Sequence, residues 1–288
     1  MNTAGAMECS WEVDGLHIAG LSWGDPKKSP MLALHGWLDN ANSFAMLAPL
    51  LNDFYVIALD LTGHGKSSKR SADASYQVYD DLPQIMGVVE QLGWESFVLM
   101  GHSRGAIIAS ILAASFPERI HRLVLLDGVA PPPLESGEFV AQMRRYVLEK
   151  KRLQNRRPRV YSTVNLAVSA REEQGLNAEA SRLIVSRSLT PVEGGHTWTT
   201  DPRLRGASAM KMTSSQVDTV LQALTMPTLL LMADQGLSAS HSSKFTSLGE
   251  RIPGVVLETF PGGHHFHMEQ GVATLGKRIQ LFLANEEL

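Results

Sequence analysis

A serine flanked by glycines, placed where an apolar run ends and a helix-forming run begins, constrains this chain more than any other feature. The pentapeptide Gly-His-Ser-Arg-Gly at 101–105 follows the apolar residues 97–100 and precedes a stretch rich in alanine and isoleucine at 106–113. A turn from a strand into a helix is tight, and glycines two residues either side of the serine leave room for neighbouring backbone. The pattern predicts that the hydroxyl of Ser103 is held above the edge of a sheet as a nucleophile.

Short apolar runs alternate along the chain with longer stretches of helical character. The first two runs, 8–13 and 16–23, flank Asp14-Gly15, a dipeptide that tolerates the positive φ angles of a two-residue hairpin turn. The later runs lack the polar alternation of a half-exposed strand, so both of their faces should be covered. They lie at 31–34, 55–59, 97–100, 123–126, 228–232 and 255–260. The order predicts an α/β fold with a mostly parallel, eight-stranded sheet, an N-terminal hairpin and helices on both faces.

The composition is that of an ordinary globular protein and limits the choice of partners and compartment. The 288 residues are 44% hydrophobic and 19% charged, which suits one large domain with an insertion. A formal net charge of -3 gives no reason to expect nucleic acid as a partner. Cys9 is the single cysteine, and the sequence has neither a signal-peptide pattern nor a membrane-spanning run, so we expect a cytoplasmic protein without membrane association. The choice between a monomer and a homodimer stays open.

One interval is far longer than an ordinary connection between a strand and the next element. It runs from the apolar run ending at Leu126 to the one starting at Thr228, and three prolines open it at 131–133. Helical candidates follow at 139–153, 162–173 and 178–189, with a loop at 191–205. We therefore expect a helical cap over the serine, residues 131–206, inserted between the core segments 1–130 and 207–288.

The expected cap carries a run of basic side chains in which Glu149 is the only acid. The basic residues are Arg144, Arg145, Lys150, Lys151, Arg152, Arg156, Arg157 and Arg159. Such a run is most often a solvated face of a helix. The alternative is electrostatic attraction of an anionic substrate or partner surface.

A serine hydroxyl is a weak nucleophile at neutral pH, so it needs a base within hydrogen-bond reach and a third group that orients the base. His264 is the candidate base, because it follows the last predicted strand and two glycines that let the loop fold back over the sheet. His265 and His267 are rivals for this role. A metal site formed by the three histidines has no acid or cysteine at ligand spacing beside it, so neither a metal nor another cofactor is expected.

Four motifs in this order resemble the α/β-hydrolase superfamily over nearly the full length of the chain. They are Leu34-His35-Gly36-Trp37, the turn at 60–67, the serine pentapeptide, and Gly263-His264 followed by Glu269. Within that superfamily, the segments 35–40 and 201–204 are similar to the serine hydrolase-like proteins. The resemblance implies an α/β-hydrolase fold with an inserted helical cap.

The resemblance also implies roles for individual residues. Two backbone amides, those of Trp37 and Arg104, would form an oxyanion hole that stabilises negative charge on the substrate. His102 would be an ordinary occupant of the pentapeptide, and His35 with the turn at 60–67 would be structural.

The acid is where the chain departs from the usual pattern of the superfamily. Most relatives carry it in the loop after the penultimate strand, where this chain has Gly236 at the expected position and Asp234 two residues earlier. Some haloalkane dehalogenases instead carry the acid at the end of the preceding strand, where this chain has Asp127. We favour Asp127 and keep Asp234 as the alternative. The carboxylate that is not the acid is expected to accept hydrogen bonds from loop amides.

These residues predict a serine hydrolase that transfers an acyl group to water. Ser103 attacks a carbonyl, His264 carries the proton, and Asp127 or Asp234 orients the imidazole. A carboxylic ester or related acyl bond of a small molecule is the expected substrate, because haloalkane and epoxide hydrolysis requires a carboxylate in place of Ser103. Two alternatives remain: a hydrolase of carbon–carbon bonds in dienoic keto acids, and a receptor that binds its ligand without chemistry.

Overall fold

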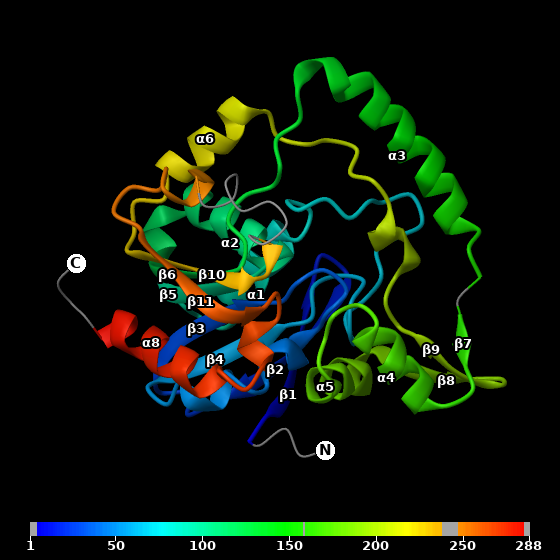
Figure 1. The fold of residues 1–288 in the computed structure, drawn as a ribbon, viewed down its shortest axis with the longest axis horizontal. Helices are drawn as coiled ribbons and strands as arrows, with labels where there is room; N and C mark the ends of the chain where they lie inside the picture. Colours follow the sequence, from blue (N-terminus) through cyan, green and yellow to red (C-terminus); the bar gives the residue numbers. More distant parts are fainter. Residues whose placement is uncertain (1–4, 158, 238–246, 285–288) are drawn as a thin grey trace.

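An eight-stranded sheet in the order β1-β2-β4-β3-β5-β6-β10-β11 forms the centre of the protein (Figure 1). The computed structural model describes residues 5–157, 159–237 and 247–284. The strands of the sheet are β1 (Met7–Val13), β2 (Leu16–Trp23), β3 (Ser29–Leu34), β4 (Phe54–Leu59), β5 (Phe97–His102), β6 (Ile120–Leu126), β10 (Thr228–Gln235) and β11 (Val256–Gly263). The pairs β1·β2 and β2·β4 are antiparallel and the remaining pairs are parallel, which confirms the predicted architecture.

The turn between β1 and β2 has the backbone conformation that its sequence predicts. Asp14 has a φ of 52° and Gly15 a φ of 73°, so both central residues of the turn lie in the left-handed region. A turn of this kind has a twist that matches the twist of the paired strands.

Helices cover both faces of the sheet because successive strand residues point to opposite sides. In β3, Leu32 and Leu34 belong to one buried cluster, whereas Met31 and Ala33 belong to the other. The first cluster includes residues of α1 (Leu82–Gln91), α2 (Arg104–Ser115) and α6 (Ser214–Gln222). The second includes residues of η1 (Ala41–Phe44), η2 (Ala48–Leu50), α5 (Ala178–Ser188), η6 (Phe266–Met268) and α8 (Val272–Ala284). The short 3₁₀ turn η3 (Pro117–Arg119) lies between α2 and β6, and η4 (Ser136–Glu138) lies in the long connection after β6.

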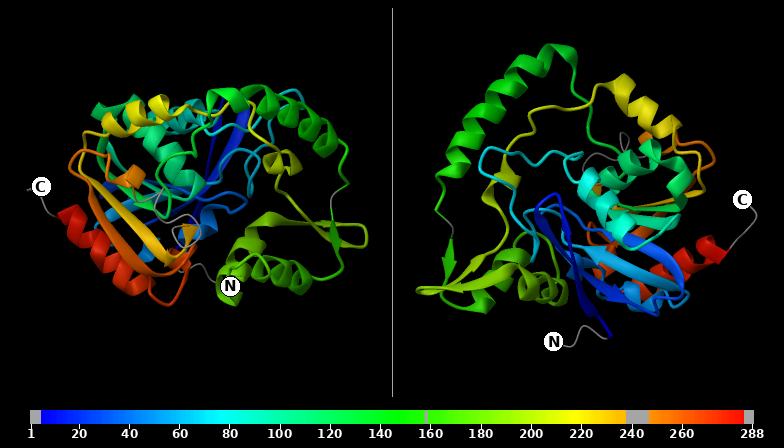
Figure 2. Two further views of the ribbon diagram at one scale, coloured as in Figure 1. Left: turned by 45° about the horizontal axis from the view of Figure 1, so that its top comes forward. Right: turned by 180° about the vertical axis from the view of Figure 1, so that it is seen from behind.

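Residues 131–206, called the inserted segment below, lie mostly to one side of the sheet (Figure 2). The segment contains α3 (Phe139–Gln154), β7 (Val160–Tyr161), α4 (Val164–Glu172), α5, β8 (Leu189–Val192), β9 (Gly195–Trp198) and η5 (Pro202–Arg205). Its three helices fall within the intervals predicted from the sequence to within about a residue or two. The predicted loop at 191–205 is wrong in part, because β8 and β9 form a hairpin that β7 joins as a three-stranded sheet. No helix in the described part of the chain is long and apolar enough to cross a membrane.

Candidate active site

Ser103 occupies the single residue between the end of β5 and the start of α2. Its φ of 52° and ψ of -116° place a non-glycine residue in a strained conformation, which surrounding structure must enforce. This conformation is enforced by main-chain atoms that pack closely against Gly101 and Gly105. A Cβ atom on Gly101 would lie 2.4 Å from the carbonyl oxygen of Gly105, and one on Gly105 would lie 2.0 Å from that of Leu34. The two glycines of the pentapeptide are therefore required by space as well as by the turn.

His264 follows β11 directly and lies within hydrogen-bond distance of two predicted site residues. Its Nε2 is 2.9 Å from Ser103 Oγ, and its Nδ1 is 2.6 Å from an oxygen of Asp127. The backbone of His264 is held as well, because its carbonyl oxygen accepts a hydrogen bond from His102 Nε2 at 2.8 Å. The structure thus brings the serine, the base and one of the two candidate acids into a single chain of hydrogen bonds.

Asp127 follows the end of β6 and is completely buried, with a φ of 42°. Besides contacting His264, its carboxylate accepts hydrogen bonds from the backbone amides of Ala233 at 3.0 Å and Leu237 at 2.9 Å. A Cβ on Gly236 would lie only 2.2 Å from Asp127 Oδ2. Two positions on different strands therefore direct a side chain to the same point, and a glycine at one leaves space for the carboxylate of the other.

Asp234, the alternative acid, lies elsewhere. One of its carboxylate oxygens accepts a hydrogen bond at 2.9 Å from the amide of Gly262, which lies near the end of β11 and two residues before His264. This is the role expected for the carboxylate that does not orient the base.

The two amides of the expected oxyanion hole come from separate parts of the chain. Arg104 is the first residue of α2, where an amide has no acceptor within the helix. Trp37 lies in the loop after β3, and no loop or turn hydrogen bond of the described residues uses the amide of either residue. The Arg104 side chain points away from this position, since its guanidinium donates to the carbonyl oxygen of Gln77 at 3.0 Å and lies 3.9 Å from Asp81.

Two buried histidines fix the loop that carries Trp37. His35 Nε2 accepts a hydrogen bond from the amide of Leu61 at 3.0 Å, and His64 Nε2 accepts one from the amide of Leu38 at 3.2 Å. Both rings must be unprotonated at Nε2 to accept these bonds. Burial lowers the pKa of His35 and brings that of His64 well below its ordinary value, which keeps the rings neutral.

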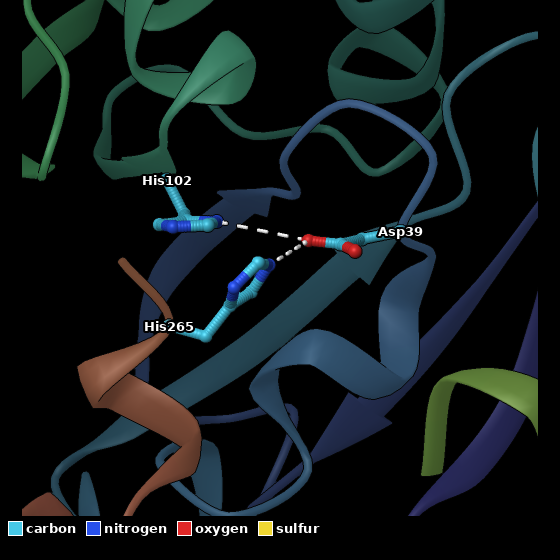
Figure 3. A group of neighbouring side chains, drawn as sticks. All are labelled: Asp39, His102 and His265. Atoms are coloured by element: carbon cyan, nitrogen blue, oxygen red, sulfur yellow. Dashed lines mark hydrogen bonds and ion pairs between the residues drawn. The ribbon is translucent and has the colours of Figure 1, made fainter. Parts of the chain in front are cut away.

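Asp39, His102 and His265 form the group of described residues that could hold a metal ion (Figure 3). Their nearest ligand atoms all lie within 4.8 Å of one another. However, Arg171 already donates to Asp39 Oδ1 at 2.6 Å, and His265 Nε2 lies 3.1 Å from Asp39 Oδ2. A cation bound here would face the guanidinium. We therefore interpret the group as a hydrogen-bond network.

The charge state of this network follows from its surroundings. Although burial raises the pKa of Asp39, His265 and Arg171 hold it well below its ordinary value. Burial, followed by the neighbouring histidines, brings the pKa of His102 well below its ordinary value. The carboxylate is thus ionised and His102 is neutral. The network joins the loop after β3 to α4 of the inserted segment and to the residue after His264.

The three histidines at 264, 265 and 267 do not converge on one point. His264 contacts Ser103 and Asp127, His265 contacts Asp39, and His267 Nε2 lies 2.8 Å from Ser43 Oγ. Because each histidine has a different hydrogen-bond partner, the three do not form the metal site that their spacing in the sequence had suggested as an alternative.

A pocket of about 240 Å³ adjoins both Trp37 and Arg104. Most of its lining is apolar, and it includes Ile107, Met210 and Met212 together with Val78, Tyr79, Pro131 and Pro132. Sequence reasoning missed these lining residues, because they come from separate loops and carry no motif. They shape the space beside Trp37 and Arg104.

Comparisons with known proteins identify the family and the fold. Residues 29–271 match the family described as the alpha/beta hydrolase fold. A serine hydrolase-like protein of Dictyostelium discoideum is 34% identical over 95% of this chain and 80% of its own length. Serine hydrolase-like protein 2 of Homo sapiens is 33% identical over 88% of this chain and 87% of its own.

Solved structures give the same picture. The crystal structure of a hypothetical protein from Pseudomonas aeruginosa PAO1 is 36% identical with a TM-score of 0.90, and the match covers 98% of this chain and 100% of that one. A thioesterase domain from the curacin biosynthetic pathway is 26% identical with a TM-score of 0.84, over 98% of this chain and 100% of that one. The chain belongs to the α/β-hydrolase superfamily, among the serine hydrolase-like proteins.

Proposed function

We propose that this protein hydrolyses carboxylic esters or thioesters of small molecules through a covalent acyl-enzyme. The observation that carries the proposal is the 2.9 Å separation between His264 Nε2 and Ser103 Oγ, together with the 2.6 Å separation between His264 Nδ1 and Asp127. A serine, a base that can take its proton, and a buried carboxylate that fixes the imidazole are the parts required for acyl transfer.

In the first half of the reaction, His264 Nε2 takes the proton of Ser103 as Oγ forms a bond to the substrate carbonyl carbon. Negative charge develops on the carbonyl oxygen, where the amides of Trp37 and Arg104 would donate hydrogen bonds, each worth roughly 3 kcal/mol. His264 then returns the proton to the leaving oxygen or sulfur as its bond to carbon breaks. In the second half, His264 takes a proton from a water molecule, which attacks the acyl carbon. The bond from carbon to Ser103 Oγ then breaks, His264 returns the proton to Oγ, and the carboxylic acid product is released.

Asp127 supports both steps without exchanging a proton. Its contact with Nδ1 keeps the imidazole proton on that nitrogen, so that Nε2 is free to accept. The amides of Ala233 and Leu237 hold the carboxylate in place. The apolar pocket of about 240 Å³ beside Trp37 and Arg104 suits an acyl group of modest size. Thioesters are included because a structural relative is described as a thioesterase domain.

The direct test replaces Ser103 with alanine. Ser103→Ala is expected to abolish labelling by a fluorophosphonate and to lower the kcat for p-nitrophenyl acetate by about 10⁴-fold or more. Ser110→Ala is the matched control, since Ser110 lies in α2, the helix that follows Ser103, and donates to the carbonyl oxygen of Ala106 at 3.0 Å. Labelling or turnover that survives in Ser103→Ala would rule out the proposal.

A substrate panel then separates the acyl hydrolase from its main alternative. The wild-type protein is assayed with p-nitrophenyl esters of increasing chain length and with a dienoic keto acid. Preference for the keto acid would instead favour cleavage of a carbon–carbon bond by the same three residues.

A further inference from the structure

A second cavity, of about 250 Å³, lies between the inserted segment and the loop that carries Trp37. Its lining is dominated by cationic side chains drawn from both parts of the chain. They are Lys69, Arg156, Arg157, Arg159, Arg171 and Arg205. Among the described residues, Asp201 is the one acidic residue that lines it, so the described lining carries an excess of positive charge.

Five of the six cations have no carboxylate partner among the described residues. Asp201 is occupied by Arg203, whose guanidinium lies 2.7 Å from it, and by the hydroxyl of Tyr76. Arg171 is paired with Asp39. The other five cations of the cavity have no carboxylate within 4.0 Å in the described ranges 5–157, 159–237 and 247–284. Like charges gathered in this way repel one another unless an anion joins them.

The basic run in the sequence thus divides into two parts in the structure. In α3, Arg145 pairs with Glu149 at 2.9 Å and Lys150 donates to the carbonyl oxygen of Asp73 at 2.5 Å. Beyond the end of α3, Arg156, Arg157 and Arg159 line the cavity. The first part fits the solvated face expected of such a run, whereas the second fits attraction of an anion.

Trp37 connects this cationic cavity with the candidate active site. The guanidinium of Arg205 lies 5.7 Å from the centre of the Trp37 ring, and Trp37 Nε1 donates to the carbonyl oxygen of Leu204 at 2.8 Å. Leu38, the next residue, lines the cationic cavity, whereas Trp37 itself lines the apolar pocket with Arg104. Two adjacent residues of the same loop therefore line the two spaces.

We propose that the cationic cavity binds phosphate groups carried by the leaving group of the ester or thioester substrate. This inference rests on the proposed function and names the substrate class: an acyl group for the apolar pocket, joined to a phosphorylated alcohol or thiol. Guanidinium groups match phosphate oxygens in paired hydrogen bonds, and several of them together require several negative charges. A single carboxylate would leave most of the cations unpaired.

A binding experiment tests the cavity without depending on turnover. Coenzyme A, a thiol that carries three phosphate groups, is titrated calorimetrically into the Ser103→Ala protein. Arg156→Gln with Arg157→Gln is expected to raise the Kd about tenfold, because two charge-assisted contacts are lost. The matched control is Arg144→Gln with Lys151→Gln, which removes the same charge from exposed positions of α3 outside the cavity. Absence of binding at 1 mM, or an equal loss in both double variants, would overturn the proposal.

A kinetic comparison tests whether the cationic cavity contributes to binding of the substrate. The wild-type enzyme is given butyryl-coenzyme A and the butyryl thioester of N-acetylcysteamine, which have the same reacting bond but differ in charge. We expect a lower KM for the coenzyme A thioester and a KM that rises with NaCl for that substrate alone. Equal KM values at low salt would overturn the inference while leaving acyl hydrolysis intact. If the wild-type enzyme did not hydrolyse neutral esters at all, that result would instead count against the proposed function.

Discussion

The turn around Ser103 and the inserted segment are held in place by different interactions. At the turn, backbone packs against backbone: Cβ atoms on Gly101, Gly105 or Gly128 would lie 2.0 to 2.7 Å from main-chain oxygens. The inserted segment contacts the core through apolar residues of α5 and also through buried ion pairs, Arg171 with Asp39 and Arg187 with Asp60. The conformation of the turn thus depends on glycines, which have no side chain. The position of the inserted segment depends in part on ion pairs between residues far apart in the sequence.

The ion pairs of the inserted segment specify its orientation more than they add stability. Arg187 donates to both carboxylate oxygens of Asp60, at 3.0 and 2.8 Å, and to Glu8 at 2.8 Å. Taking such charges out of water cancels much of their attraction, but leaving one without its partner is costly. Removing one partner of a pair is therefore expected to destabilise the segment more than replacing both partners.

The largest expected effect lies at the turn region and concerns the acid. Asp127→Asn should lower kcat about 10⁴-fold, because the amide can no longer hold the imidazole in the productive tautomer. Asp234→Asn should keep most of the activity, since the hydrogen-bond partner of Asp234 among the described residues is the amide of Gly262 and not His264. Both kcat values are measured with a neutral ester, with circular dichroism as the check on folding. A reversed order would assign the role to Asp234.

The steric basis of the turn is tested by Gly105→Ala. The new methyl group would lie 2.0 Å from the carbonyl oxygen of Leu34, and both atoms belong to packed backbone that cannot move cheaply. We expect a loss of about 3 kcal/mol in the free energy of unfolding, measured by urea denaturation. Gly137→Ala is the control, because nothing lies within 4 Å of the added atom. Equal stability of the two variants would contradict the steric account.

The same contrast explains what the sequence could predict. The strands, the hairpin turn and the glycines at the serine follow from residue size and local periodicity, so they were predictable. Asp127 was favoured over Asp234 only by the resemblance to some haloalkane dehalogenases, because both residues follow apolar runs and the direction of each side chain depends on backbone geometry. Arg171 and Asp39 stand 132 residues apart, and no local pattern marks them as partners. The β8–β9 hairpin was missed because its strands are four residues each and one contains Pro191.

Breaking one ion pair should loosen the inserted segment and leave the turn unchanged. Arg171→Met leaves the Asp39 carboxylate buried without its guanidinium, which is expected to cost about 3 kcal/mol. Amide hydrogen exchange should become faster in α4 and α5 while β5 and α2 stay protected. Arg182→Met, at an exposed position of α5, is the control. Addition of Asp39→Asn to Arg171→Met should recover part of the loss, and failure to recover any would contradict the ion-pair explanation.

The acid can also be moved between its two alternative positions. Asp127→Ala combined with Gly236→Asp should regain about 10²-fold in kcat over Asp127→Ala, a part of the 10⁴-fold lost. Recovery is expected because a Cβ on Gly236 points at the space of the Asp127 carboxylate, 2.2 Å from Oδ2. It is expected to be partial because the same Cβ would lie 2.7 Å from that of Ala233. Gly236→Asp alone should lower activity, since two carboxylates would then compete for one place.

The smallest expected effect is a difference between the two regions in how the free energy of unfolding depends on pH. His64 holds the loop next to the turn as a neutral ring, and burial brings its pKa well below the ordinary value near 6.5. Below pH 6.5 the unfolded chain therefore binds a proton that the folded chain does not, so the free energy of unfolding falls as pH falls. His64 contributes at most about 1.4 kcal/mol per pH unit. Asp39 has a lowered pKa, so its contribution is lost only under more acidic conditions, below the ordinary carboxyl pKa near 4.

Urea denaturation between pH 8 and pH 5 measures this difference. His64→Gln retains an acceptor for the amide of Leu38 but removes the proton-binding group, so the slope of stability against pH should decrease by up to about 1.4 kcal/mol per pH unit. His121→Gln is the control, because His121 is exposed on β6. In the same range, hydrogen exchange of α4 should change no more than that of the core, since Asp39 stays ionised. An undiminished slope in His64→Gln would mean that other buried groups set the acid sensitivity of the core.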